Sequence, residues 1–200
     1  MIFLDPAGNG KLAGSNMSGS GEGLAIMADD MEKLKEKLEE TMKAMPKFEK
    51  FKKNVQIIVT GEGLRIELLE SEKGMFFESG KPNPSEQGRE LLANLSEELG
   101  KLPNKLLVEG HTDAKPHTLG SYSNWELSAD LANSARRMMM GSGVRVDRVG
   151  QVRGFSGQQL RKPNDPEHPS NRRIAVLVQY LTPPAWKAPD EKKLAERGSH

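Results

Sequence analysis

Several absences limit what this chain can be. It has no cysteine, which excludes disulfides, thiolate nucleophiles and cysteine-ligated zinc. It contains no run close to the ~20 apolar residues of a membrane span, and no signal peptide is visible. Its 29 Lys and Arg nearly cancel its 28 Asp and Glu. This balance argues against a nucleic-acid partner held by phosphate neutralisation.

The 200 residues suffice for one domain with extensions. Residues 1–23 hold seven Gly or Pro and predict a flexible lead-in. Residues 182–200 predict a disordered tail that ends in the remnant of an expression tag. Residues 24–53 predict an amphipathic linker helix, because apolar residues recur every seven positions at Leu24, Met31, Leu38 and Met45. Two interpretations stay open: the helix docks on its own domain, or it pairs with a second copy in a homodimer.

Strand and helix patterns alternate through the domain at 54–181. The predicted strands are 55–60, 64–69, 105–109, 149–154 and 173–180, and the predicted helices begin at Ser85 and Asn124. The glycines around Glu62 favour a hairpin between the first two strands. We therefore expect an α/β (α+β) sandwich, a single sheet with helices packed on one face, preceded by the long amphipathic helix.

A polar loop between a strand and a helix is the best candidate for a site. The apolar run that begins at Leu107 ends in Gly110–Asp113, which places a carboxylate just after a strand. Ser123 and Glu126 have the spacing of a capping box, which predicts a helix start. The positive end of that helix would lie near Asp113. This arrangement predicts a site for a small charged ligand.

Three motifs carry a resemblance to a known family. Gly110–Asp113, Tyr122–Asp130 and Asn171–Arg173 together resemble the OmpA-like peptidoglycan-binding domain, and the match runs from about Val55 to Leu181. The string Ser123–Asp130 most resembles MotB-like flagellar stator subunits. The resemblance implies a mixed sheet, a non-catalytic binding function, and neither cofactor nor metal. It also implies a periplasmic domain of a protein anchored in the inner membrane, with an exporting segment upstream and a MotA-like channel partner.

The resemblance also implies a ligand, the diaminopimelate side chain of the peptidoglycan stem peptide. Its zwitterionic end needs an acid and a base, and the acid falls on Asp113. Thr112 shapes the same loop, and Asn124 belongs to the second motif. The family's Arg is replaced here by Leu131, which cannot donate to a carboxylate, so binding is expected to be weakened.

Several alternatives remain. Arg172 and Arg173 are candidates for a replacement base. A metal site at His111, Asp113 and His117 is disfavoured, and Trp125 is interpreted as a packing residue more readily than as a platform for sugar. As functions, a general envelope tether (an outer-membrane protein or lipoprotein domain) and a structural dimerisation domain stand beside the stator anchor.

Overall fold

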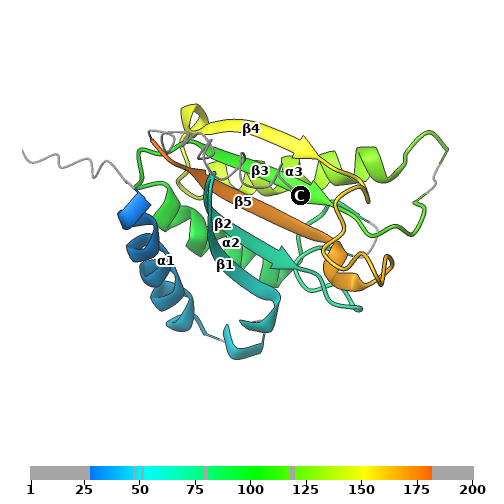
Figure 1. Ribbon diagram of the computed structural model, residues 1–200, viewed down its shortest axis with the longest axis horizontal. Helices are drawn as coiled ribbons and strands as arrows, with labels where there is room; N and C mark the ends of the chain where they lie inside the picture. Colours follow the sequence, from blue (N-terminus) through cyan, green and yellow to red (C-terminus); the bar gives the residue numbers. More distant parts are fainter. Residues whose placement is uncertain (1–27, 47, 51, 79–80, 118–119, 182–200) are drawn as a thin grey trace, which may run out of the picture.

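The structure, a computed structural model, describes residues 28–46, 48–50, 52–78, 81–117 and 120–181 (Figure 1). The expected lead-in, the expected tail and residues 24–27 of the expected helix lie outside these ranges. The elements in chain order are α1 (Ala28–Lys43), η1 (Phe48–Lys50), η2 (Lys52–Asn54), β1 (Val55–Thr60), β2 (Gly63–Leu69), α2 (Glu86–Leu99), β3 (Leu106–His111), α3 (Asn124–Gly141), η3 (Val146–Arg148), β4 (Val149–Gly154), η4 (Pro169–Asn171) and β5 (Arg173–Gln179). Among the described helices, none combines the length and apolar character of a membrane span.

The five strands form one mixed sheet in the order β1-β2-β5-β3-β4. β1 and β2 are joined as the expected hairpin, with Thr60 opposite Gly63. β5 lies antiparallel to both β2 and β3, whereas β3 and β4 are parallel. A parallel pair needs a crossover connection, and α3 supplies it. The predicted mixed sheet and fold class are confirmed.

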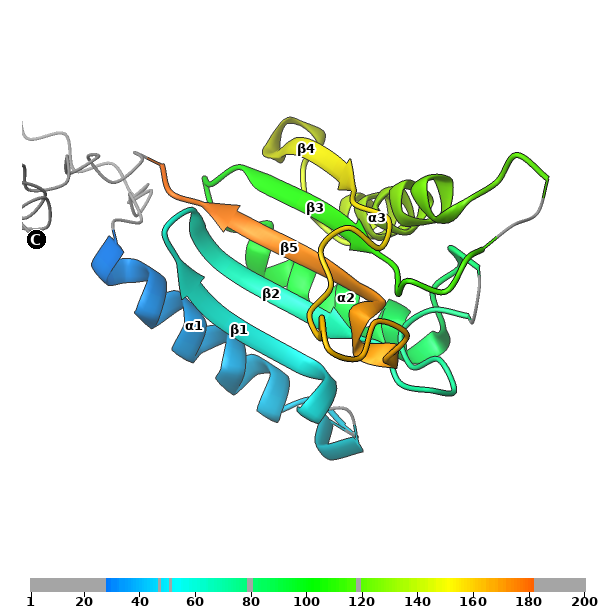
Figure 2. The same ribbon diagram turned by 45° about the vertical axis from the view of Figure 1, so that its right-hand side comes forward.

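One face of the sheet carries the hydrophobic core. Ile57, Ile66, Val176 and Val108 are matched across neighbouring strands, and all four belong to one buried cluster. Leucines of α2 and α3 join the same cluster, so both helices cover this face (Figure 2). Apolar residues at alternate strand positions place their side chains on one side of the sheet, which explains the layering.

Helix α1 packs along the β1–β2 side of the sheet and against α2 (Figure 2). Its apolar stripe is buried by its own domain, with Met31 and Leu38 both 0% exposed. Burying each of these side chains stabilises the fold by roughly 1.5–3 kcal/mol. The heptad pattern therefore reflects docking within one chain, and a homodimer would need a surface other than this stripe.

The helix stops at Lys43, three residues before Pro46. Proline disfavours helical geometry in the residue before it and lacks the amide that would continue the ladder. After Lys43, the described residues of the expected helix form a turn and the short helices η1 and η2. Buried Phe48 in η1 keeps this connection attached to the core.

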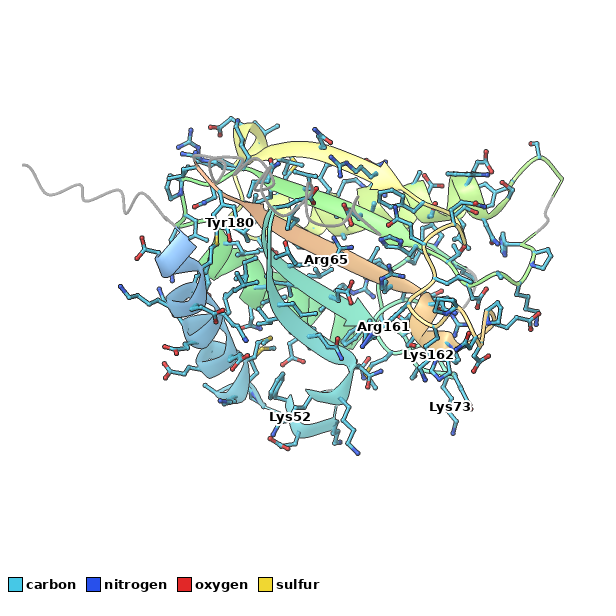
Figure 3. The ribbon with its side chains drawn as sticks, viewed as in Figure 1. Lys52, Arg65, Lys73, Arg161, Lys162 and Tyr180 are labelled. Atoms are coloured by element: carbon cyan, nitrogen blue, oxygen red, sulfur yellow. The ribbon has the colours of Figure 1, made fainter. Side chains whose placement is uncertain are left out.

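The opposite face of the sheet carries a charged network around Glu109. Its carboxylate lies 2.7 Å from Nη2 of Arg65 and 3.4 Å from Nη1 of Arg153, and its side chain is only 4% exposed (Figure 3 labels Arg65). Arg65 also bonds Glu67. Burial alone would raise the pKa of Glu109, but the neighbouring His111 and Arg65 outweigh burial and lower that pKa to about 2.

This low pKa predicts how acid destabilises the fold. The carboxylate of Glu109 adds stability that is present above its ordinary pKa of 4.5 and is lost as pH falls toward 2. Replacing it in Glu109→Gln should cost on the order of 3 kcal/mol at pH 7 and much less near pH 2. Urea unfolding across this pH range measures the difference. Glu62→Gln in the exposed hairpin turn is the control, and a cost for Glu109→Gln that does not change with pH would contradict the prediction.

Candidate functional site

The loop after β3 places an acid at the edge of the sheet. The strand runs two residues further than expected, so His111 is its last residue and pairs with Arg173 of β5. Asp113 is 6% exposed, and its Oδ2 accepts a hydrogen bond from Nη1 of Arg172 at 2.6 Å. Its Oδ1 accepts from the amide of Lys115 at 3.2 Å. The carboxylate is therefore held in a fixed position before any ligand arrives.

The start of α3 is tied to this loop. The predicted capping box is confirmed, because Ser123 Oγ accepts from the amide of Trp125 and Glu126 accepts from the amide of Ser123 at 2.7 Å. The Asn124 side chain donates to the carbonyl oxygen of Lys115 at 2.9 Å. This hydrogen bond ties the first turn of α3 to the loop after β3.

Two glycines let α3 approach the strand ends. A Cβ added to Gly110 would lie 1.9 Å from the carbonyl oxygen of Ser128, and one added to Gly154 would lie 2.7 Å from the amide nitrogen of Ala129. No side chain fits at either position unless the helix moves. The Ser128 hydroxyl uses this proximity to accept from the amide of Ser156 at 2.9 Å.

Arg172 joins the acid to a second loop. Its Nη2 donates to the carbonyl oxygen of Ser71 at 3.0 Å while Nη1 binds Asp113. The neighbouring Glu70 carboxylate accepts from three successive amides, those of Met75, Phe76 and Phe77. Burial raises the pKa of Glu70, although these amides and the charge of Arg172 oppose the shift. Glu70 thus anchors the 71–77 loop that forms the far wall of the site.

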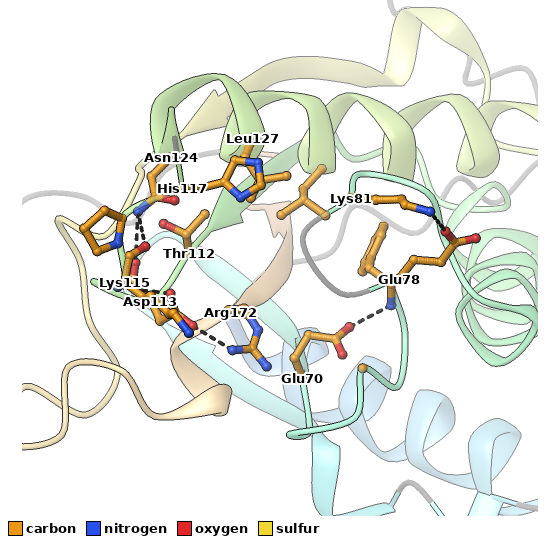
Figure 4. Close-up of a pocket in the computed structure, with 14 residues that line it drawn as sticks. Glu70, Glu78, Lys81, Thr112, Asp113, Lys115, His117, Asn124, Leu127 and Arg172 are labelled. Atoms are coloured by element: carbon orange, nitrogen blue, oxygen red, sulfur yellow. Dashed lines mark hydrogen bonds and ion pairs between the residues drawn. The ribbon is translucent and has the colours of Figure 1, made fainter. Parts of the chain in front are cut away.

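These elements enclose a cavity of about 260 Å³ (Figure 4). Its walls mix an apolar side with charges of both signs. The lining residues are Glu70, Gly74, Phe77, Glu78, Lys81, Thr112, Asp113, Lys115, Pro116, His117, Asn124, Leu127, Leu131 and Arg172. Three carboxylates face three cationic side chains in this set. Such a balance suits a small ligand that carries both charges.

The structure brings five of the six candidate site residues to this cavity: Thr112, Asp113, Asn124, Leu131 and Arg172. Arg173 lies elsewhere. It is 7% exposed, bonds Glu67 Oε1 at 3.3 Å, and so belongs to the charged network on the opposite face of the sheet. Arg172 follows η4 and precedes the strand, whereas Arg173 is the first residue of β5, and the two side chains bond different partners.

No sequence motif pointed to the wall formed by Glu70, Glu78 and Lys81. These residues follow β2 and lie far in sequence from the three motifs, so no local pattern connected them with the site. His117 also lines the cavity, whereas His111 stacks on Phe155 with ring centroids 4.9 Å apart. Among the described residues, no group of three or more His, Asp or Glu side chains is arranged to hold a metal ion.

Comparisons with known proteins point to one family. Residues 76–173 match the OmpA family. Motility protein B of Escherichia coli K12 is 33% identical over 150 residues, which cover 74% of this chain and 49% of that protein. Motility protein B of Bacillus subtilis is 28% identical over 150 residues, covering 72% of this chain and 56% of the relative. The chain thus spans about half the length of these relatives.

Solved structures show the same fold. A MotB-like protein of Desulfovibrio vulgaris superposes with a TM-score of 0.62 at 15% identity, covering 76% of this chain and 96% of that one. The periplasmic domain of Helicobacter pylori MotB gives a TM-score of 0.56 at 17% identity, covering 72% and 94%. At these identities the similarity establishes the architecture.

The close contact between Gly110 and the backbone of α3 provides a test of how the site is positioned. Gly110→Ala should cost about 3 kcal/mol or more, because the new methyl group meets the α3 backbone and not a flexible side chain. Gly141→Ala is the matched control: its Cβ meets nothing within 4 Å, and alanine favours the helix by up to about 1 kcal/mol. Thermal unfolding of both variants measures the contrast. Equal stability of the two variants would show that α3 can shift freely.

Proposed function

Residues 76–173 match the OmpA family and the chain is similar to motility protein B, and from this premise we propose that it binds peptidoglycan and anchors a flagellar stator to the cell wall. The observation that supports the proposal most is the cavity in which Asp113, Asn124 and position 131 meet. The role is binding without catalysis. The ligand is the zwitterionic end of diaminopimelate in the stem peptide.

In this proposal Asp113 receives the ligand's ammonium group. The carboxylate is nearly buried and already bonded, so it is oriented before binding and loses little entropy. Its pairing with Arg172 at 2.6 Å also means that the ammonium must share or displace a strong, charge-assisted bond. That competition lowers the net gain from the ammonium contact.

The ligand's carboxylate has no partner at position 131. Leu131 is 8% exposed, lies in the buried cluster and presents an apolar wall to the cavity. Of the two arginines considered as substitutes, Arg172 is favoured because it lines the cavity beside Asp113. Arg172 already donates hydrogen bonds to the Asp113 carboxylate and to the carbonyl oxygen of Ser71. We therefore expect it to bind the ligand's carboxylate less well than an arginine at position 131 would.

The relatives support a wider assignment. We propose a periplasmic location for this domain, attachment to the inner membrane through a segment outside this chain, and a MotA-like channel partner. A homodimer stays a prediction. Helix α1 no longer supports it, because its apolar stripe is already buried.

Changing Leu131 tests the proposed binding mode. Leu131→Arg should raise affinity for purified wall sacculi by roughly ten-fold or more, since it restores one charge-assisted hydrogen bond. Asp113→Ala in that background should remove the gain. Sedimentation with sacculi measures both, and Leu131→Met, which adds no charge, is the control.

Thermal unfolding must accompany this assay, because an arginine in a position that is 8% exposed is expected to lower stability. If the unaltered chain binds as tightly as Leu131→Arg, position 131 is not where the carboxylate is held, and Arg172→Ala should then abolish binding. If neither chain sediments with sacculi, the proposed function is wrong.

A further inference from the structure

The wall that α3 contributes to the cavity is apolar. Leu127 and Leu131 both lie on this helix and are 6% and 8% exposed, and Phe77, which is 5% exposed, lines the same cavity. The family resemblance places an arginine at position 131. An apolar wall in that place favours an uncharged group of the ligand over an ionised one, because a charge that leaves water without a partner is strongly disfavoured.

The cations that line the cavity offer a ligand carboxylate little compensation. Arg172 already donates to the Asp113 carboxylate at 2.6 Å and to a backbone carbonyl oxygen at 3.0 Å. Lys81 donates to the carboxylate of Glu78 at 3.1 Å. Lys115 is exposed, and ion pairs that stay in contact with water are weak. A carboxylate of the ligand would therefore have to displace an existing bond or stay poorly compensated.

Two uncharged polar atoms of lining residues suit a neutral group. Within the described part of the chain, the Thr112 hydroxyl and Nε2 of His117 are shielded from solvent and form no hydrogen bond. In the view of Figure 4 both residues lie between Asp113 and Leu127. A carboxamide can donate to one of these atoms and accept from the other, whichever tautomer the histidine takes. A carboxylate can only accept, so it requires both atoms to donate.

We propose that this cavity prefers a stem peptide in which the carboxylate beside the ammonium of diaminopimelate is amidated. The inference rests on the proposed function and refines its ligand. The ammonium still binds to Asp113, and the neutral carboxamide lies against Leu131. The acid form binds less well because its second charge meets an apolar wall, so the preference comes from a penalty on one form of the ligand.

The test compares two synthetic tripeptides, L-Ala–γ-D-Glu–meso-diaminopimelate with the side-chain carboxylate either free or amidated. The two ligands differ in this one group, so the difference in affinity reports on what surrounds it. NMR titration of the full chain measures both affinities, including weak ones. The unaltered chain should bind the amide about three- to ten-fold more tightly than the acid.

Leu131→Arg should reverse this preference and favour the acid by about ten-fold or more, since it supplies the missing cation. Leu131→Met is the matched control, because methionine has a similar volume and no charge, and it should keep the preference for the amide. Thermal unfolding shows whether each variant is folded. The comparison of the two peptides on the unaltered chain requires no variant, so it decides the question even if Leu131→Arg fails to fold.

The outcomes separate this inference from the proposed function. Equal affinity of the unaltered chain for both peptides, or tighter binding of the acid, overturns the preference for the amide and leaves the peptide site standing. Failure to bind either peptide also overturns it. The proposed function is wrong as well only if the chain then fails to sediment with sacculi.

Discussion

The close contact between the backbone of α3 and the ends of β3 and β4 is the constraint on which the site depends. Gly110 and Gly154 bring the helix so near that a methyl group at either position would collide with its backbone. This proximity places the helix N-terminus beside the loop of Asp113 and lets the Asn124 side chain bridge the two. The helix fixes one wall of the cavity, and the position of Asp113 depends on the contact between α3 and the strand ends.

The two faces of the sheet serve different purposes. The face under the helices is apolar and forms the hydrophobic core. The other face carries charges that are largely shielded from water, in which Glu67 and Glu109 are surrounded by arginines. Buried charges are tolerated only when they are paired, and this network pairs Glu67 and Glu109 with arginines on β2, β4 and β5. Arg173 belongs to this network, and its neighbour Arg172 belongs to the cavity.

The pairing of Asp113 with Arg172 gives the site its particular character. An acid that already has a cationic partner is preorganised, but a ligand must compete with that partner. Leu131 adds an apolar wall where the family resemblance places an arginine. The cavity therefore contains an acid and a base, and in the structure these two charges are paired with each other. Selectivity for the right geometry is easier to explain from this arrangement than tight binding.

The sequence by itself predicted the five strands and the two helices of the domain, and it singled out Asp113 as the candidate acid. Strand alternation and the capping box at Ser123 and Glu126 are local effects, because each depends on residues within a few positions. The motif Gly110–Asp113 pointed to the same loop that borders the cavity.

Only the tertiary structure showed which surface covers the apolar stripe of α1, and that surface is the chain's own core. It likewise separated Arg172 from Arg173, brought Glu70 and Lys81 to the cavity, and left Trp125 exposed. These outcomes depend on contacts between segments far apart in the chain. A local pattern cannot state them, because periodicity shows that a face is apolar but not which surface covers it.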